Sequence, residues 1–420
     1  MLPSTQSAYR TKFSTETALL RVHNDLVNAI DLGQIAGLVL LDLSAAFDTV
    51  NHSILHDVFS ERFGITGDAL QWLSSYLQER TQVVTIGESR SSNRKLVCGV
   101  PQGSVLGPKQ FIAYIEDVTE VFDKNGVFYH GYADDMQGLR SCPPAQLASV
   151  TDSFRNLISD VRDWCSSRGL QLNPLKTELI WFGSSTHLRQ LAINDSKIIV
   201  DNSTTIDPVR VVRDLGVFFD SELTMHDHIS RVSRDCFYQL RRLRLVRRHL
   251  SRDVMKCLIC SFVLSKLDYC NALLAGLPAA SLRPLQRVQN AAARLVLGLK
   301  WSDHITPALK ELHWLPIRQR ICYKLCIIVH KCIHNQSSDY LSELFEHISD
   351  IPSRSSLRSA SNGKLNVPRT RLHFGERAFA VAGAHEWNLL PTKLRTVSDF
   401  SAFKAELKTH LFMIAFNPYS

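Results

Sequence analysis

The chain has 420 residues, of which 45% are hydrophobic and 21% charged, and its formal net charge is +8. This composition excludes a largely disordered or collagen-like chain, and the length allows two or three domains. The positive balance suits a polyanionic partner. Its ten cysteines form no small-domain disulfide framework, and no apolar run approaches the ~18 residues of a membrane span. We therefore expect reduced thiols, no membrane association and a location in the nucleus or cytoplasm.

The first part of the chain alternates helical and strand patterns. A capped amphipathic pattern predicts a helix from Ser14 to Gly33, and a short apolar strand follows over 36–41. Apolar periodicity then predicts further elements in order: helices over 51–61 and 68–79, a hairpin of strands 81–86 and 94–98, and a helix over 111–122.

Three aspartates stand at strand ends. Asp42 ends the strand 36–41, whereas Asp134 and Asp135 form the tip of a hairpin that follows the apolar stretch 127–129. Adjacent strand residues point to opposite faces, so one of the two neighbours aims into a shared site and the other lies beside it. Carboxylates held this close repel by several kcal/mol at an effective dielectric of ~20, and a divalent cation removes that cost. Because turns favour Asp, the pair alone is weak evidence for a site. Together with Asp42 it predicts a site for two cations roughly 3.5–4 Å apart.

These segments resemble a known family. Asp42 with Phe47 resembles motif A of reverse transcriptases, 99–104 resembles motif B, and 132–135 resembles motif C. The surrounding sequence is similar to non-LTR retrotransposons (LINEs) of the jockey-like group, from about Ser7 to the C-terminus. The resemblance implies an α+β fold, with a right-hand polymerase palm followed by an all-α thumb and a C-terminal helical region. It implies an RNA-directed DNA polymerase that uses two Mg²⁺ ions, or Mn²⁺, with an RNA template, a DNA primer and deoxynucleoside triphosphates.

The resemblance also assigns catalytic roles to four residues. Asp42 and Asp134 would hold both metal ions, and Asp135 would assist them. Lys176 lies in a segment that resembles motif D, where the family's lysine is near the leaving pyrophosphate and serves as general acid. By residue type alone, Lys176 is a solvated lysine.

Four further residues are implied to contact the nucleotide. The backbone of Leu43 would lie against the triphosphate, and Gln102 and Gly103 would lie under the nascent base pair. Phe47, five residues after Asp42, matches the steric gate that blocks a ribose 2′-hydroxyl; the alternative is a core aromatic. Asp48 is expected to brace the turn.

The second part of the chain becomes mostly helical. Three predicted elements come before this helical part: a long amphipathic helix from Pro143 to Trp164, a strand over 179–182 and a hairpin over 211–219. Helices are predicted over 226–250, 251–277, 282–299, 316–335, 376–390 and 400–412, and 226–252 is rich in arginine: Arg231, Arg234, Arg241, Arg242, Arg244, Arg247, Arg248 and Arg252. We expect these arginines to contact the phosphates of a template–primer duplex. The predicted domains are a palm with a remnant of the fingers (1–220), a basic thumb (221–300), a helical region (301–348), a linker (349–366) and a small helical segment (367–420).

Two alternatives to an active reverse transcriptase remain open. One is a truncated relic that binds RNA or duplex nucleic acid without turnover. The other is an RNA-dependent RNA polymerase, against which Phe47 and Ala133 argue. Because the chain starts where the family's fingers are nearly complete, we expect no endonuclease, few fingers and slow extension. Lys109 and Gln110 replace apolar residues of the family, which puts the packing of the next helix in question.

Cysteine and histidine patterns give weaker signals. Cys257 and Cys260 have the spacing of half a zinc site, but no matching half follows at a suitable distance, and we expect two buried thiols. A second group falls on a helix whose apolar period favours core burial over zinc: Cys322, Cys326, His330, Cys332 and His334.

Overall fold

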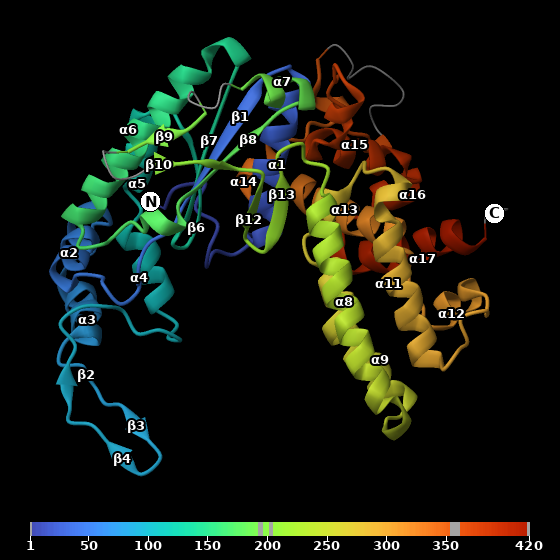
Figure 1. Ribbon diagram of the computed structural model, residues 1–420, viewed down its shortest axis with the longest axis horizontal. Helices are drawn as coiled ribbons and strands as arrows, with labels where there is room; N and C mark the ends of the chain where they lie inside the picture. The colour runs from blue at the N-terminus through green and yellow to red at the C-terminus, as the bar shows by residue number, and fades with distance from the viewer. Residues whose placement is uncertain (1, 192–195, 201–204, 353–361, 418–420) are drawn as a thin grey trace. The chain divides into compact units, whose positions relative to one another are not determined.

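The computed structural model describes residues 2–191, 196–200, 205–352 and 362–417. The chain forms two compact units, shown in Figure 1. The first unit comprises residues 1–14, 34–181 and 185–209, and the second comprises 15–33, 182–184 and 210–420. The boundaries predicted from the sequence stay a prediction. The fold is a mixture of helices and sheet, as expected, and no helix among the described residues is long and apolar enough to cross a membrane.

The first unit is built on a five-stranded sheet with the order β11-β8-β1-β7-β6. β1 pairs antiparallel with β7, and β7 pairs antiparallel with β6, the two strands of the central hairpin. β1 is almost wholly buried, which explains its continuous apolar sequence. The strands are β1 (Ile35–Leu41), β6 (Phe128–Tyr132), β7 (Asp135–Cys142), β8 (Glu178–Phe182) and β11 (Pro208–Val209).

Helices and short ribbons complete the first unit. The long helix α6 (Leu147–Ser167) packs on β1 and β7 through its apolar stripe, as its periodicity predicted. The other helical segments are α2 (His52–Asp57), η1 (Val58–Arg62), α3 (Gly67–Leu77), α4 (Gly107–Tyr114), α5 (Val118–Lys124), η2 (Pro144–Gln146), η3 (Pro174–Lys176) and α7 (Ser185–Gln190). Two-residue strands form an exposed ribbon that extends beyond α3 (Figure 1): β2 (Thr81–Gln82), β3 (Thr85–Ile86), β4 (Ser89–Arg90) and β5 (Arg94–Lys95). β9 (Ile198–Ile199) pairs with β10 (Thr205–Ile206).

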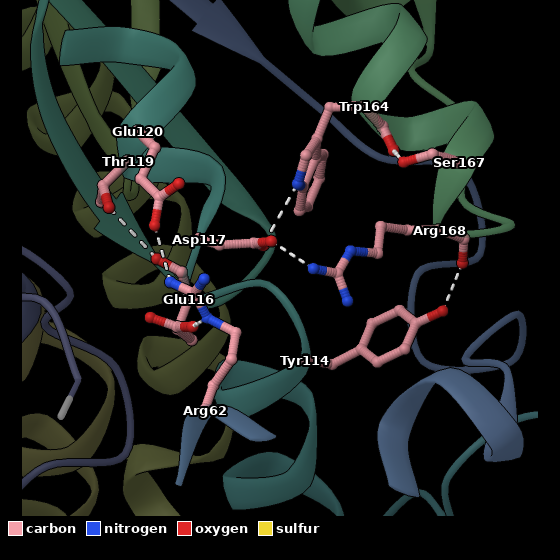
Figure 2. Close-up of polar contacts among 9 residues, drawn as sticks. All are labelled: Arg62, Tyr114, Glu116, Asp117, Thr119, Glu120, Trp164, Ser167 and Arg168. Atoms are coloured by element: carbon pink, nitrogen blue, oxygen red, sulfur yellow. Dashed lines mark hydrogen bonds and ion pairs between the residues drawn. The ribbon is translucent and has the colours of Figure 1, made fainter. Parts of the chain in front are cut away.

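The predicted single helix over 111–122 is wrong. α4 ends at Tyr114, and α5 begins at Val118 after a tight turn. Figure 2 shows the reason: the turn directs Asp117 toward the end of α6, where it accepts hydrogen bonds from Trp164 Nε1 at 3.1 Å and from Arg168. The hydroxyl of Tyr114 donates to the carbonyl of Arg168, and Arg62 bridges the acidic side chains on the other side of the turn, Glu116 and Glu120.

We expect Asp117→Ala to lower the free energy of unfolding by about 2 kcal/mol, below the ~3–5 kcal/mol of fully buried pairs, because Arg168 and Trp164 would lose their acceptor. The side chains of Arg168 and Asp117 are only 16% and 13% exposed. Urea unfolding would measure the change, with Asp163→Ala as the control, because Asp163 is an exposed aspartate of α6 outside these contacts. Equal unfolding midpoints for the two variants would contradict a stabilising role for the Asp117 contacts.

The second unit contains the N-terminal helix α1 (Thr15–Asp31), the hairpin β12 (Val211–Asp214) and β13 (Val217–Asp220), and the C-terminal helices. α8 (His226–Val246) packs along α11 (Ala279–Leu297). The others are η4 (Arg247–His249), α9 (Arg252–Ile259), η5 (Cys260–Leu264), α10 (Ser265–Asp268), η6 (Asn271–Leu274), α12 (Ile305–Glu311), α13 (Ile317–Ile333), α14 (Asp339–Ser342), η7 (Ile348–Asp350), η9 (His373–Arg377), α15 (Phe379–Leu389), α16 (Thr392–Arg395) and α17 (Phe400–Phe416).

Two sequence predictions are wrong in this unit, and a third is only partly covered by the described residues. The helix expected over 251–277 is interrupted by a π-helical segment, and Cys270 in a left-handed conformation separates α10 from η6. Cys257 and Cys260 are exposed, not buried. The predicted linker over 349–366 lies partly outside the described residues, and on its described flanks His347 and Leu365 form a β-bridge.

Candidate active site

The sheet register brings the three predicted aspartates to one end of the first unit. Leu41, the last residue of β1, pairs with Met136 of β7, so Asp42 leaves the sheet where Asp135 begins β7. Tyr132 pairs with Asp135 across the hairpin, and Ala133 and Asp134 form its tight turn. The structure therefore places the strand-end aspartate beside the hairpin pair, as the sequence predicted.

The carboxylates of this cluster disturb one another. Burial raises the pKa of Asp134, the nearby charge of Asp42 raises it further, and Lys176 opposes both. Asp135 is exposed as a whole residue, yet its carboxylate loses enough water for its pKa to rise to about 6, first by burial and then through the charges of Asp134 and Asp42. The ionised forms of these neighbouring carboxyl groups are disfavoured, and a hard cation bound between them would stabilise the ionised forms.

The fourth predicted catalytic residue belongs to the same cluster. The loop after α6 runs antiparallel to the segment after β1: Leu172 bridges Leu43, and the amide of Asn173 donates to the carbonyl of Asp42 at 2.9 Å. This pairing carries Lys176 to Asp42, where Nζ lies 3.0 Å from Oδ2. Lys176 is exposed but ion-paired, so it is more than a solvated surface lysine.

The Gly-rich loop lies against the turn after Asp42. The amide of Val100 donates to the carbonyl of Phe47 at 2.9 Å, and Gln102 Nε2 donates to Asp48 Oδ1 at 3.0 Å. Gly99 has a φ of +89°, and a Cβ there would lie 2.9 Å from the carbonyl oxygen of Asp48, so both backbone conformation and space require glycine. Asp48 thus braces the turn, as expected, with Gln102 as its partner.

The two predicted nucleotide-facing positions of the loop, Gln102 and Gly103, are exposed. Phe47 is half-buried and stacks on Phe111 with the ring centroids 4.4 Å apart and an interplanar angle of 21°. The ring therefore has one packed face and some remaining exposure, which fits both interpretations of Phe47.

The departure at 109–110 has a structural consequence. Lys109 is exposed, whereas Gln110 is 2% exposed and neither atom of its amide has a hydrogen-bond partner among the described residues. An unsatisfied buried amide is costly compared with an apolar side chain of the same size. The helix nevertheless packs: Phe111, Ile112 and Tyr114 are buried.

Gln6 was missed by sequence reasoning. It is 2% exposed, and its side chain bonds the backbone of Ala133 in the hairpin turn. No local pattern indicates this contact, because the two residues are 127 positions apart.

The donor chemistry of the cluster fits magnesium, because carboxylate oxygens are the ligands that this ion prefers. Within the described ranges, however, no three His, Cys, Asp or Glu side chains are grouped closely enough to hold a metal ion. The carboxylate of Asp42 is instead neutralised by Lys176. Metal binding by all three aspartates would therefore require Asp42 to exchange the ammonium group for the cation.

A cavity of about 840 Å³ lies elsewhere, in the second unit, between α11, α13, α15 and the 367–370 segment. Its floor is aliphatic, with Leu282, Ile321 and Leu325 among its residues. It contains none of the predicted site residues.

Comparisons with known proteins show the family of the chain. The family described as "Reverse transcriptase (RNA-dependent DNA polymerase)" matches residues 1–217. The chain is similar to the "RNA-directed DNA polymerase from mobile element jockey" of Drosophila funebris, with 26% identity over 270 residues that cover 61% of this chain and 28% of that protein. It is similar to the "Probable RNA-directed DNA polymerase from transposon BS" of Drosophila melanogaster, with 27% identity over 249 residues, 58% of this chain and 26% of that protein.

Another relative matches more of the chain. The "Probable RNA-directed DNA polymerase from transposon X-element" of Drosophila melanogaster is 25% identical over 380 residues, 86% of this chain and 37% of that protein. The chain thus spans between about a quarter and two fifths of the length of these relatives. Among solved structures, telomerase from Candida albicans in complex with a fragment of telomeric RNA aligns with a TM-score of 0.39 and 13% identity over 85% of this chain and 54% of that chain, too low for any functional argument.

Proposed function

Because the chain belongs to the reverse transcriptase (RNA-dependent DNA polymerase) family, we propose that it extends a DNA primer on an RNA template with deoxynucleoside triphosphates. The predicted resemblance to jockey-like reverse transcriptases is confirmed by its relatives. The observation that carries the proposal is the clustering of Asp42, Asp134, Asp135 and Lys176 within one another's electrostatic influence. The right-hand arrangement belongs to the same proposal: the first unit supplies the palm, and α8 to α11 supply the thumb.

The aspartates have the oxygen chemistry to hold Mg²⁺, with Asp42 and Asp134 as the main ligands and Asp135 as an additional one. When bound, two such ions activate the primer 3′-hydroxyl and neutralise charge on the leaving pyrophosphate. The remaining contributions come from the chain itself. The three carboxylates bring negative charge to one end of the sheet, Lys176 balances part of it, and the paired strands behind them set their positions.

We assign Leu43 and Lys176 to the triphosphate. The hydrogen bonds that join the two loops flank Leu43, since they run from Ser44 to the carbonyl of Gln171 and from Asn173 to that of Asp42. The amide of Leu43 is not used in these bonds, so we assign it to a phosphate oxygen. Once released from Asp42, the ammonium group of Lys176 can donate a proton to the departing pyrophosphate.

A primer-extension assay tests the proposal. An RNA template with an annealed DNA primer, Mg²⁺ and four deoxynucleotides should give products of increasing length, and chelation of the metal should stop them. A chain that binds the template–primer but never extends it, over a range of Mg²⁺ and Mn²⁺ concentrations, would overturn the proposal.

That outcome would favour a second function, nucleic-acid binding without turnover. Its structural support is the ion pair between Asp42 and Lys176, which occupies the carboxylate that the chemistry needs. The same assay separates the two functions, because binding can be measured by fluorescence anisotropy on the labelled primer before nucleotide is added.

The steric-gate assignment gives a separate prediction. Phe47→Val should raise ribonucleotide incorporation relative to deoxynucleotide incorporation by about ten- to a hundredfold, because the smaller side chain leaves room for a 2′-hydroxyl, and one such contact is worth about 1–3 kcal/mol. Single-nucleotide extension with matched ribo- and deoxynucleotides would measure the ratio of kcat/KM.

Phe111 provides the control for this measurement. Phe111 is fully buried and is the ring on which Phe47 stacks. Phe111→Leu therefore disturbs the packing of Phe47 but leaves the Phe47 side chain at its full size. If Phe47→Val and Phe111→Leu changed sugar selection equally, or neither changed it, Phe47 would be a core residue only.

A further inference from the structure

The turn that carries Asp134 is held by a residue far away in the sequence. The N-terminal segment lies parallel to β6: the amide of Gly131 donates to the carbonyl of Thr5 at 3.0 Å, and the amide of Ser7 donates to the carbonyl of Gly131 at 2.8 Å. This short pairing brings the side chain of Gln6, at 2% exposure, over the hairpin turn.

Gln6 binds both polar groups of a single backbone residue. Its Oε1 accepts a hydrogen bond from the amide of Ala133 at 3.1 Å, and its Nε2 donates to the carbonyl of Ala133 at 3.4 Å. Oε1 also accepts from the amide of Ala8 at 3.1 Å, which orients the side chain. The side-chain amide therefore binds both backbone groups of Ala133 as a neighbouring strand would.

Ala133 is a residue that needs such support. Its φ is +57°, in the left-handed region that L-residues other than Gly, Asn and Asp rarely adopt. It lies directly between Tyr132, the end of β6, and Asp134. A change in the peptide on either side of Ala133 would redirect the carboxylate of Asp134, because only these two residues connect the paired strand ends Tyr132 and Asp135.

The surroundings preserve the position of Gln6. Arg10 donates to the carbonyls of Pro3 at 2.6 Å and Gln6 at 2.9 Å, which fixes the backbone that carries the glutamine. Gly131 leaves the required space, because a Cβ there would lie 3.0 Å from Gln6 Nε2 and would collide with the hydroxyl of Tyr129.

We propose that Gln6 is a positioning residue for the reaction: by binding both backbone groups of Ala133, it holds the left-handed turn and thereby sets the carboxylate of Asp134. This inference rests on the proposed function for its catalytic consequence, but not for its structural one. Gln6 contacts no reacting atom, so the loss should appear in kcat and not in the binding of template–primer.

The test compares Gln6→Ala with Ser7→Ala. Ser7 is 1% exposed in the same segment, and its hydroxyl lies 3.0 Å from His130 Nε2, so the control removes an equally buried polar contact to β6 and keeps the side chain of Gln6 that binds Ala133. We expect Gln6→Ala to lower kcat about ten- to a hundredfold, since a displacement of ~1 Å can cost about a hundredfold. KM for nucleotide and Kd for template–primer should stay within about twofold of the wild-type values, and the Mg²⁺ concentration for half-maximal extension should rise.

A second readout needs no activity. Hydrogen–deuterium exchange of the peptide that covers 129–137 should become faster in Gln6→Ala than in Ser7→Ala, because the amide of Ala133 loses its acceptor. If the wild-type chain extends no primer, the proposed function fails, and exchange alone then decides whether Gln6 holds the turn. Equal exchange in the two variants, or a kcat for Gln6→Ala within about twofold of wild type, would overturn the inference. Equal losses of kcat in both variants would reduce Gln6 to a general structural role.

Discussion

Asp134→Asn is expected to lower primer extension at least about a thousandfold. The substitution keeps the size of the side chain but removes an anionic oxygen from the cluster. Metal-assisted stabilisation of transition-state charge amounts to several kcal/mol, and each ~1.4 kcal/mol is tenfold in rate. Asp42→Asn should have a similar effect, with the additional loss of the ion pair to Lys176. Single-turnover extension with excess enzyme would measure both variants.

Asp134→Asn should not lose stability, although it loses activity. The pKa of Asp134 is raised in the folded protein by burial and by the charge of Asp42, so its ionised form destabilises the fold at neutral pH. Removing that charge should leave the urea midpoint unchanged or increase it. Asp123→Asn is the control, because Asp123 is an exposed aspartate of the same unit outside the cluster. Near-normal extension by Asp134→Asn, or an equal loss in Asp123→Asn, would show that the cluster is not the catalytic centre.

Combined replacement of Arg241, Arg244 and Arg248 by Gln is expected to weaken template–primer binding and its salt dependence. Arg241 and Arg244 lie on α8 and Arg248 lies just after it; all are exposed and make no ion pair with any other residue that the structure describes. The slope of log K against log salt should fall by roughly one for each lost phosphate contact, about three in all. The difference should be largest at low salt, where counterion release contributes most. Fluorescence anisotropy at several salt concentrations would measure the slopes.

Charge alone must be separated from position in this experiment. Lys393→Gln, Lys404→Gln and Lys408→Gln together remove the same charge from exposed positions of the C-terminal helices. If this control lowers the slope as much as the arginine variant does, the chain binds nucleic acid by overall charge, and α8 is not a specific duplex-binding helix. If neither changes the slope, the thumb assignment fails.

The basic helix also shows which arginines are unsuitable for such a test. Arg247 donates to the carbonyls of Leu295 at 2.9 Å and Val296 at 3.1 Å and so caps α11, and Arg252 pairs with Glu311 at 2.5 Å. Arg231 lies over the ring of Phe218, 4.2 Å from its centroid. The sequence alone does not distinguish these arginines from the three chosen for replacement. Their contacts in the structure show that they stabilise the fold, whereas the three chosen arginines can bind phosphate.

The amino-acid sequence by itself determined the elements and the chemistry of the site. A strand with both faces buried reads as an uninterrupted apolar run, and a helix with one buried face repeats every three to four residues, so β1 and α6 were predictable from local pattern. Asp42, Asp134 and Asp135 were predictable because an aspartate that ends one strand and an Asp-Asp hairpin farther along the chain match two motifs of one family. The strand register then placed them together, as expected.

Only the tertiary structure decided which contacts hold that site. Gln6 reaches Ala133 across 127 positions, Lys176 reaches Asp42 across 134, and Asp117 divides a helix because its partners lie on α6. The resemblance placed Lys176 in the site, but no local pattern predicts any of these three contacts. Local periodicity records which face of an element is buried, whereas a long-range hydrogen bond depends on where the chain returns in space, and that is determined by the fold as a whole.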